Sequence, residues 1–253
     1  MKIGLVQYNP EWESKETNKL KLLKLISALN EEVSLLIFPE MTLTGFTMQS
    51  SLFAEEYEGE SFNFFKEIAK ENNCDVIAGI IVKSEEKYFN SSVHIDNSGK
   101  TVIRYDKIHP FSPSGEDKHY SAGKQAVITE MNDVKTGLSV CYDLRFPELF
   151  RFYANEKVDL IVAIANWPVS RIEHWRTLLK ARAIENQCYV AGVNRVGTDP
   201  SHQYNGYSSI YDPMGKNIAE SFNEEKIITA YIDIKLVQET RTKLPFLNDI
   251  KLI

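Results

Sequence analysis

The chain has 253 residues, of which 43% are hydrophobic, so it can bury one sizeable core without dividing into separate domains. Its 29 basic and 35 acidic residues give a net charge of −6, which excludes the broad positive field of a nucleic-acid-binding protein. No stretch approaches the roughly 18 apolar residues of a membrane span, and the first ten residues lack the features of a signal peptide. We therefore expect one domain, residues 1–253, in the cytoplasm.

Hydrophobic periodicity predicts alternating strands and helices along the chain. In the first half, we expect helices at 17–29 and 62–71, and strands at 2–7, 33–38, 75–82, 88–95 and 101–105, the last two forming a hairpin. In the second half, we expect helices at 148–155 and 172–186, and strands at 127–131, 136–140, 160–165, 189–194, 207–211 and 227–232. This interleaving indicates two sheets covered by helices on their outer faces.

A thiol and two charged groups stand directly after three apolar runs. Cys141 follows residues 138–140 and precedes residue types that begin helices, so we expect it at a strand-to-helix turn. The positive helix N-terminus would favour the thiolate there. Glu40 follows the run 35–39, and Lys107 follows the run 101–106. If the three runs are neighbouring strands of one sheet, their ends bring a thiol, a carboxylate and an ammonium together.

The segments that carry these residues, LLIFPEMTLTGF, RYDKIHPF and GLSVCYDLRFPE, resemble the signature segments of the nitrilase superfamily of carbon–nitrogen hydrolases. The resemblance is specific, because the three motifs occur in the same order, and it covers nearly the whole chain. It implies an α/β fold, the four-layer αββα sandwich, with Glu40, Lys107 and Cys141 as the catalytic set. Within the superfamily, the stretch that begins IANWPVSRIEHW is most similar to the bacterial omega-amidases, which act on 2-oxoglutaramate and related amides of 2-oxo acids.

Amide hydrolysis needs a nucleophile, a base that later acts as an acid, and donors for the oxyanion. Cys141 can supply the nucleophile. Glu40 can take the thiol proton, give it to departing ammonia, and then activate the water that opens the thioester. Lys107 can hold the oxyanion together with the backbone N–H of Tyr142. Taken singly, each side chain has a structural alternative: an inert buried thiol, a capping glutamate or a surface lysine.

A second glutamate completes the expected catalytic set. Glu116 lies nine residues after Lys107, at a position similar to the glutamate with which many family members orient the lysine and the substrate. Asp117 beside it is the alternative assignment, and a solvated loop carboxylate is the structural alternative.

Because the net charge is negative, a small anionic amide substrate would have to be held by local cations. Arg145, Arg171 and Arg195 are the candidates for its carboxylate, since a guanidinium forms a two-pronged, charge-assisted contact with that group. We expect Arg171 to make this contact. Arg145 could instead bridge Asp143 or Glu148 and stiffen the turn.

Three further residues are candidates for substrate contacts. Asn166 and Trp167 follow the strand predicted at 160–165 and should reach the same sheet edge, although a core tryptophan is an equally ordinary role. Phe46, in the loop after Glu40, could close over a short aliphatic substrate.

The sequence leaves other functions open. Relatives with the same catalytic set hydrolyse N-carbamoyl amines, nitriles or deaminated glutathione. A Cys-His hydrolase would need one of His109, His119 or His174 as its base, and a non-catalytic binding protein could share the fold. Cys74 and Cys188 stand at the start of apolar strands, where buried structural roles are expected.

The spacing of the cysteines and histidines predicts neither a disulfide framework nor a metal site, and we expect no cofactor. Family members commonly pair across the helices that correspond to residues 148–155 and 172–186. We therefore expect a homodimer with these two helices at its interface.

Overall fold

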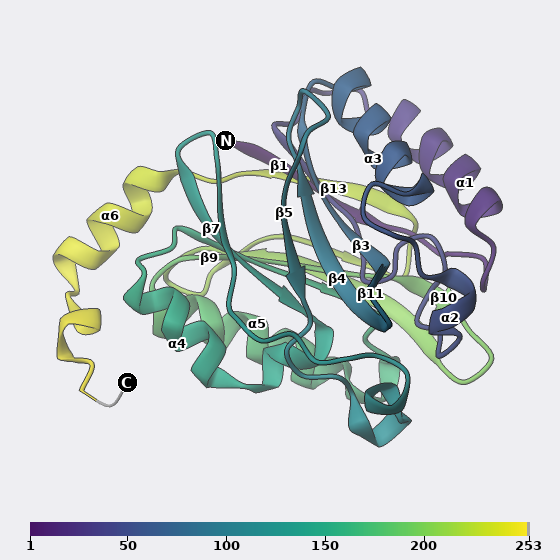
Figure 1. Cartoon of the computed structure of the whole chain (residues 1–253). Helices are drawn as coiled ribbons and strands as arrows, with labels where there is room; N and C mark the ends of the chain where they lie inside the picture. The colour runs from purple at the N-terminus through teal and green to yellow at the C-terminus, as the bar shows by residue number, and fades with distance from the viewer. Residues whose placement is uncertain (252–253) are drawn as a thin grey trace.

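Two β-sheets pack face to face, and helices cover their outer faces, in this computed structural model, which describes residues 1–251 (Figure 1). The first sheet has the strand order β13-β1-β2-β3-β4-β5. Its strands are β1 (Lys2–Gln7), β2 (Leu35–Ile37), β3 (Asp75–Ser84), β4 (Lys87–Ile95), β5 (Thr101–Asp106) and β13 (Lys226–Tyr231).

The second sheet has the order β10-β11-β9-β8-β7-β6, with β12 paired to β11. Its strands are β6 (Ile128–Met131), β7 (Val134–Val140), β8 (Leu160–Ala165), β9 (Tyr189–Asn194), β10 (Val196–Thr198), β11 (Gln203–Tyr211) and β12 (Asn217–Phe222). The pairs β7–β8 and β8–β9 are parallel, so the carboxyl ends of these three strands share one edge.

The helices form the outer layers of the sandwich. In Figure 1, α1 (Lys15–Ser27) and α3 (Glu60–Glu71) lie against the first sheet, and α4 (Pro147–Asn155) and α5 (Ile172–Asn186) lie against the second. The short α2 (Ser50–Phe53) follows the loop after β2, and α6 (Ile234–Lys243) lies beside the sandwich near the end of the chain. Short 3₁₀ helices occur at η1 (Ser112–Ser114), η2 (Glu116–Lys118), η3 (Cys141–Arg145), η4 (Val169–Arg171) and η5 (Phe246–Asp249).

Alternation along the strands builds two apolar layers. On β2 and β3, Ile37 and Ile77 belong to the core between the sheets, whereas Leu36 and Val76 belong to the layer under α1 and α3. Because successive side chains of a strand point to opposite faces, apolar runs such as these fill both layers. The four-layer αββα sandwich is therefore confirmed.

Most of the predicted elements are present, with ends that differ by a few residues. The strands predicted at 2–7, 160–165 and 189–194 and the helix at 172–186 have the predicted bounds. The sequence analysis did not predict α2, α6, β10 or β12. Among residues 1–251, no helix has the length and apolarity needed to cross a membrane.

The runs before Glu40, Lys107 and Cys141 are not neighbouring strands of one sheet, which was the condition under which we expected their ends to meet. β2 and β5 belong to the first sheet and are separated by β3 and β4, whereas β7 belongs to the second sheet. The three strand ends meet because the two sheets face each other.

Candidate active site

Glu40 lies in a turn that packs directly against β3. After β2, the chain passes over Gly79, where a Cβ atom would lie 2.4 Å from Met41 N and 2.7 Å from Glu40 Cα. Thr42 N also donates a hydrogen bond to Gly79 O at 2.9 Å. A residue with a side chain at position 79 would push this turn away, so the glycine fixes the depth at which the carboxylate is buried.

Cys141 begins η3 immediately after β7, with a φ of 48°. This left-handed conformation is uncommon for a residue with a Cβ atom and marks a sharp turn at the strand end. The side chain is half-buried and opens on a pocket, and Sγ lies 4.0 Å from Asn166 O. The expected strand-to-helix turn is therefore present, with α4 starting at Pro147.

A buried cluster of charges lies beside the thiol. Lys107 Nζ donates to Glu40 Oε1 at 2.9 Å and to Glu116 Oε2 at 2.8 Å. Asn90 Nδ2 bridges the same two carboxylates, at 2.7 Å from Glu40 Oε1 and 2.8 Å from Glu116 Oε1. All four side chains are almost inaccessible to solvent, whereas Asp117 is exposed, so Glu116 is the residue that faces the lysine.

The second oxygen of Glu40 contacts the other sheet. Asn166, which follows β8, donates its backbone N–H to Glu40 Oε2 at 2.9 Å, and its Nδ2 donates to Glu40 O at 2.7 Å. The carboxylate is thus held at Oε1 by the lysine cluster and at Oε2 by Asn166. Asn166 was predicted as a substrate contact, but the structure also shows it orienting Glu40.

The charged groups in this cluster shift one another's pKa values. Burial disfavours the charge on Lys107, but Glu116 and Glu40 more than offset it and raise the pKa of Lys107 well above its usual value. Burial raises the pKa of Glu116, and the lysine only partly opposes it. Burial and the Glu40 charge raise the pKa of Cys141 well above its usual value, with Lys107 opposing them. This direction opposes the effect expected of the helix N-terminus, which would favour the thiolate, because desolvation and the two carboxylates favour the protonated thiol.

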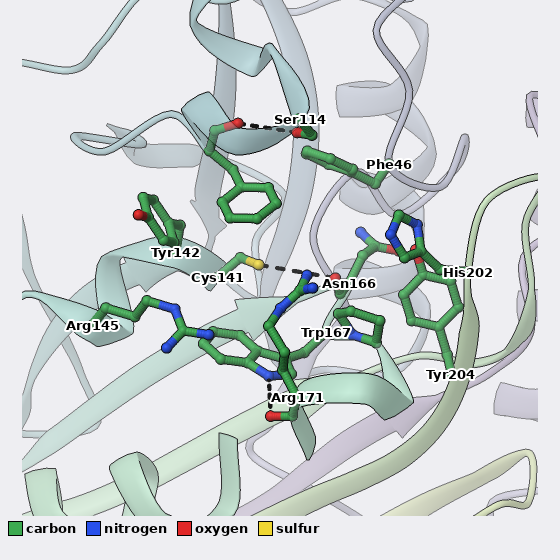
Figure 2. A pocket seen from close by; sticks show the side chains of 12 residues that line it. Phe46, Ser114, Cys141, Tyr142, Arg145, Asn166, Trp167, Arg171, His202 and Tyr204 are labelled. Atoms are coloured by element: carbon green, nitrogen blue, oxygen red, sulfur yellow. Dashed lines mark hydrogen bonds between the residues drawn. The ribbon is translucent and has the colours of Figure 1, made fainter. Parts of the chain in front are cut away.

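The pocket above the thiol encloses about 450 Å³, including its open mouth. Figure 2 shows Cys141 at its centre, with aromatic side chains around it. The pocket is lined by Phe46, Phe111, Ser114, Cys141, Tyr142, Arg145, Asn166, Trp167, Pro168, Arg171, His202 and Tyr204. Phe46 also covers the lysine, since Lys107 Nζ lies 5.4 Å from the centre of its ring.

Two of the three candidate arginines reach this pocket. Arg171 Cζ lies 5.3 Å from the centre of the Phe111 ring, and the guanidinium points toward Cys141 in Figure 2. Arg145 Cζ lies 4.7 Å from the centre of the Trp167 ring, and its Nη1 lies 3.3 Å from His174 Nδ1 rather than against Asp143 or Glu148.

The third arginine, Arg195, has a different place. It is buried below the pocket, with Cζ 4.5 Å from the centre of the Tyr204 ring, and it donates to the backbone oxygen of Thr198 at 2.8 Å. Arg195 thus supports the pocket wall at Tyr204 and does not line the pocket.

The histidines proposed for a Cys-His hydrolase lie elsewhere. His109 Nδ1 lies 2.8 Å from Asp143 Oδ1, His174 contacts Arg145, and His119 is exposed in the loop after η2. Cys74 and Cys188 are buried, and burial raises the pKa of each thiol to about 12. Within the described chain, no group of three or more His, Cys, Asp and Glu side chains is arranged to hold a metal ion.

Sequence reasoning missed Asn90, His202 and Tyr204. Asn90 is buried within β4 in a polar run with Ser91 and Ser92, and such a run in an otherwise apolar strand is the signal that could have identified it. His202 and Tyr204 come from the β10–β11 hairpin, which was predicted only in part.

Comparison with known proteins agrees with this architecture. Residues 2–242 match the carbon–nitrogen hydrolase family. The chain is 32% identical to the 2-oxoglutaramate amidase of Bacillus subtilis over 251 residues, covering 98% of this chain and 97% of that protein. It is 33% identical to the omega-amidase YafV of Yersinia enterocolitica, covering 98% of this chain and 96% of the relative.

Among solved structures, the chain is similar to XC1258 of Xanthomonas campestris, a CN-hydrolase superfamily protein with an arsenic adduct in its active site. The TM-score is 0.95 at 31% sequence identity, over 100% of this chain and 98% of that one. The family match, these relatives and the shared fold show that the chain belongs to the carbon–nitrogen hydrolases of the nitrilase superfamily.

Proposed function

We propose that this protein is a thiol-dependent omega-amidase. It hydrolyses the terminal amide of small 2-oxo dicarboxylic acid monoamides, such as 2-oxoglutaramate and 2-oxosuccinamate, to the acid and ammonia. The observation that carries the proposal is a single half-buried thiol, Cys141, set between a buried Glu40–Lys107–Glu116 cluster and a pocket that contains two arginines. The names of the relatives from Bacillus subtilis and Yersinia enterocolitica support the choice of substrate.

In the first half of the reaction, the amide carbon lies against Cys141 Sγ. Glu40 removes the thiol proton as the sulfur attacks, which suits a thiol that stays protonated at rest because its pKa is raised. A sulfur–carbon bond forms, and the carbonyl oxygen becomes an oxyanion. Lys107 and the backbone N–H of Tyr142 stabilise this charge.

In the second half, the carbon–nitrogen bond breaks as Glu40 gives its proton to the departing nitrogen, and ammonia leaves a thioester on Cys141. Glu40 then takes a proton from water, and the water oxygen attacks the thioester carbon. The carbon–sulfur bond breaks to release the acid, and Glu40 returns its proton to Cys141 Sγ, which restores the thiol. Glu116 and Asn90 hold Lys107 and Glu40 in place, since both contact the same charge cluster.

The pocket above the thiol suits a short anion. Burial and the charge of Arg171 lower the pKa of Arg145, which indicates that the two guanidiniums repel each other. A substrate carboxylate relieves that repulsion. We assign the carboxylate to Arg171, because its side chain points toward the sulfur and Arg145 is held by Trp167 and His174. Phe46 and Trp167 enclose the aliphatic chain.

Ammonia release across a panel of amides tests this function. The panel contains 2-oxoglutaramate, 2-oxosuccinamate, deaminated glutathione, N-carbamoylputrescine and a simple nitrile. We expect the highest kcat/KM for the two 2-oxo acid amides. Faster hydrolysis of N-carbamoylputrescine or deaminated glutathione would reject the omega-amidase assignment and leave another carbon–nitrogen hydrolase activity.

The homodimer and the cytoplasmic location stay predictions. In support of the dimer, α4 and α5 lie side by side through an Arg151 to Glu185 contact and expose two apolar side chains, Phe152 and Ile184. Light scattering at micromolar concentration should give twice the chain mass of 29.0 kDa. Ile184→Glu should shift the protein to monomer, and a monomeric wild type would reject this interface.

A further inference from the structure

Asp143 is fully buried beneath the thiol and accepts four hydrogen bonds. Its Oδ2 accepts from Val140 N at 2.9 Å and from the Tyr105 hydroxyl at 2.7 Å. Its Oδ1 accepts from His109 N at 3.0 Å, and His109 Nδ1 lies 2.8 Å from the same oxygen. Both oxygens therefore act as acceptors, as expected of a carboxylate.

The donors flank the two residues whose relative position matters most for the proposed chemistry. Tyr105 and His109 stand two residues before and two residues after Lys107, and Val140 directly precedes Cys141. One carboxylate thus ties the segment that carries the lysine to the turn that carries the thiol.

The hydrogen bonds to Asp143 join two segments that are not connected through either sheet. β5 is the edge strand of the first sheet and β7 belongs to the second, so no ladder of backbone hydrogen bonds joins them. The turn also holds Cys141 at a φ of 48°, a conformation that surrounding contacts must maintain. Burial and the charge of Asp143 raise the pKa of Tyr105 well above its usual value, so the hydroxyl stays a donor.

We propose that Asp143 is a positioning residue that sets the Lys107 ammonium relative to the Cys141 sulfur during formation of the thioester. The proposal rests on Cys141 as the nucleophile of the proposed function. Asp143 itself touches no reacting atom. Its effect should appear in the rate of the chemical step, because a misplacement of about 1 Å can cost on the order of 100-fold in rate.

Asp143→Asn tests the proposal, since the variant keeps the size of the side chain but loses the acceptor at one oxygen. The number of competent active sites, meaning those whose Cys141 reacts with iodoacetamide, is measured first by stoichiometric alkylation. Peptide mapping confirms that the label is on Cys141. We expect kcat per competent site to fall about 10- to 100-fold and KM to change by less than about 3-fold.

The matched control is Asp75→Asn. Asp75 is also buried and accepts a backbone hydrogen bond, from Asn97 N at 3.0 Å, but it lies at the start of β3, away from Glu40. The Asp75→Asn variant should have a lower melting temperature than the wild type but the same kcat per competent site. If Asp143→Asn behaves like this control, Asp143 serves only the fold and the proposal is overturned.

A second variant keeps the test decisive if Asp143→Asn does not fold. Tyr105→Phe removes one of the four donors and should lower kcat per competent site about 3- to 10-fold at unchanged KM. Unchanged turnover in Tyr105→Phe would contradict the proposal. If the wild type turns over none of the panel amides, the proposed function fails instead, and the rate of Cys141 alkylation in the same variants replaces kcat as the measure of positioning.

Discussion

Lys107 Nζ lies 2.9 Å from Glu40 Oε1, although β3 and β4 separate the two strands, β2 and β5, that precede these residues. Their side chains meet beside Cys141, and Lys107 Nζ also contacts Glu116. Two carboxylates and one ammonium are therefore buried together, and the single cation must serve both acids. Because both carboxylates depend on this one ammonium, loss of the lysine charge should destabilise the cluster.

Lys107→Met should lower both turnover and stability. Loss of one oxyanion donor should reduce kcat by at least about 100-fold. Glu40 and Glu116 would stay buried without a counter-ion, at a cost of roughly 3 to 5 kcal/mol in the free energy of unfolding at neutral pH. Burial already raises the pKa of Glu116, and the variant lacks the lysine that partly opposes this shift. Because the folded-state pKa then lies above the unfolded value of about 4.3, stability should fall as pH rises from that value.

Thermal unfolding of Lys107→Met between about pH 5 and pH 8, roughly the range in which raised carboxyl pKa values lie, checks whether stability falls as pH rises. The double variant Lys107→Met with Glu116→Gln removes one of the stranded charges. It should recover part of the stability while staying inactive. A single variant that melts at the wild-type temperature at every pH would show that the cluster is not held by charge.

The pH profile of kcat/KM should be flat in the alkaline range. The pKa values of Lys107 and Cys141 are both raised, so the ammonium keeps its charge and the thiol keeps its proton until Glu40 removes it. The pKa of Glu116 is also raised, so this carboxylate gains a proton at a pH above the usual glutamate value of about 4.3. On the acid side, activity should therefore begin to fall above that value. Activity that rises about tenfold per pH unit around pH 8 would instead indicate a thiolate formed by simple ionisation.

The strand ends could be predicted because Glu40, Lys107 and Cys141 each follow a run of apolar residues. Their assignment to two sheets could not, since periodicity identifies a strand but not its neighbour. The role of Asn90 could not be predicted, because its contacts with Glu40 and Glu116 depend on which strands pair. The protonation of Cys141 could not be predicted either, because it depends on how deeply the two carboxylates are packed beside it.

Weak patterns explain the missed elements. α6 buries only Val237 and Thr240 of its ten residues, and its last six residues, QETRTK, include no apolar side chain. β12 (Asn217–Phe222) is mostly exposed or half-buried, with Ser221 as its buried residue, and it lacks the apolar alternation of a strand with a face in the core.

Arg171→Ala should change specificity more than turnover. Only an anionic substrate loses a charge-assisted contact worth about 1.5 to 3 kcal/mol, so KM should rise roughly 10- to 150-fold for 2-oxoglutaramate and little for a neutral amide of similar length. Arg145→Ala is the matched control in the same pocket and should have the smaller effect. An unchanged ratio of the two KM values in Arg171→Ala, with a changed ratio in Arg145→Ala, would move the carboxylate to Arg145.

The most direct test is ammonia release from 2-oxoglutaramate by the wild type and by Cys141→Ala, measured side by side. Cys141 is half-buried at the pocket, so its loss should leave the melting temperature close to that of the wild type. The account predicts steady release by the wild type and none above the buffer rate by the variant. Release by Cys141→Ala at a rate near that of the wild type would contradict the thioester mechanism.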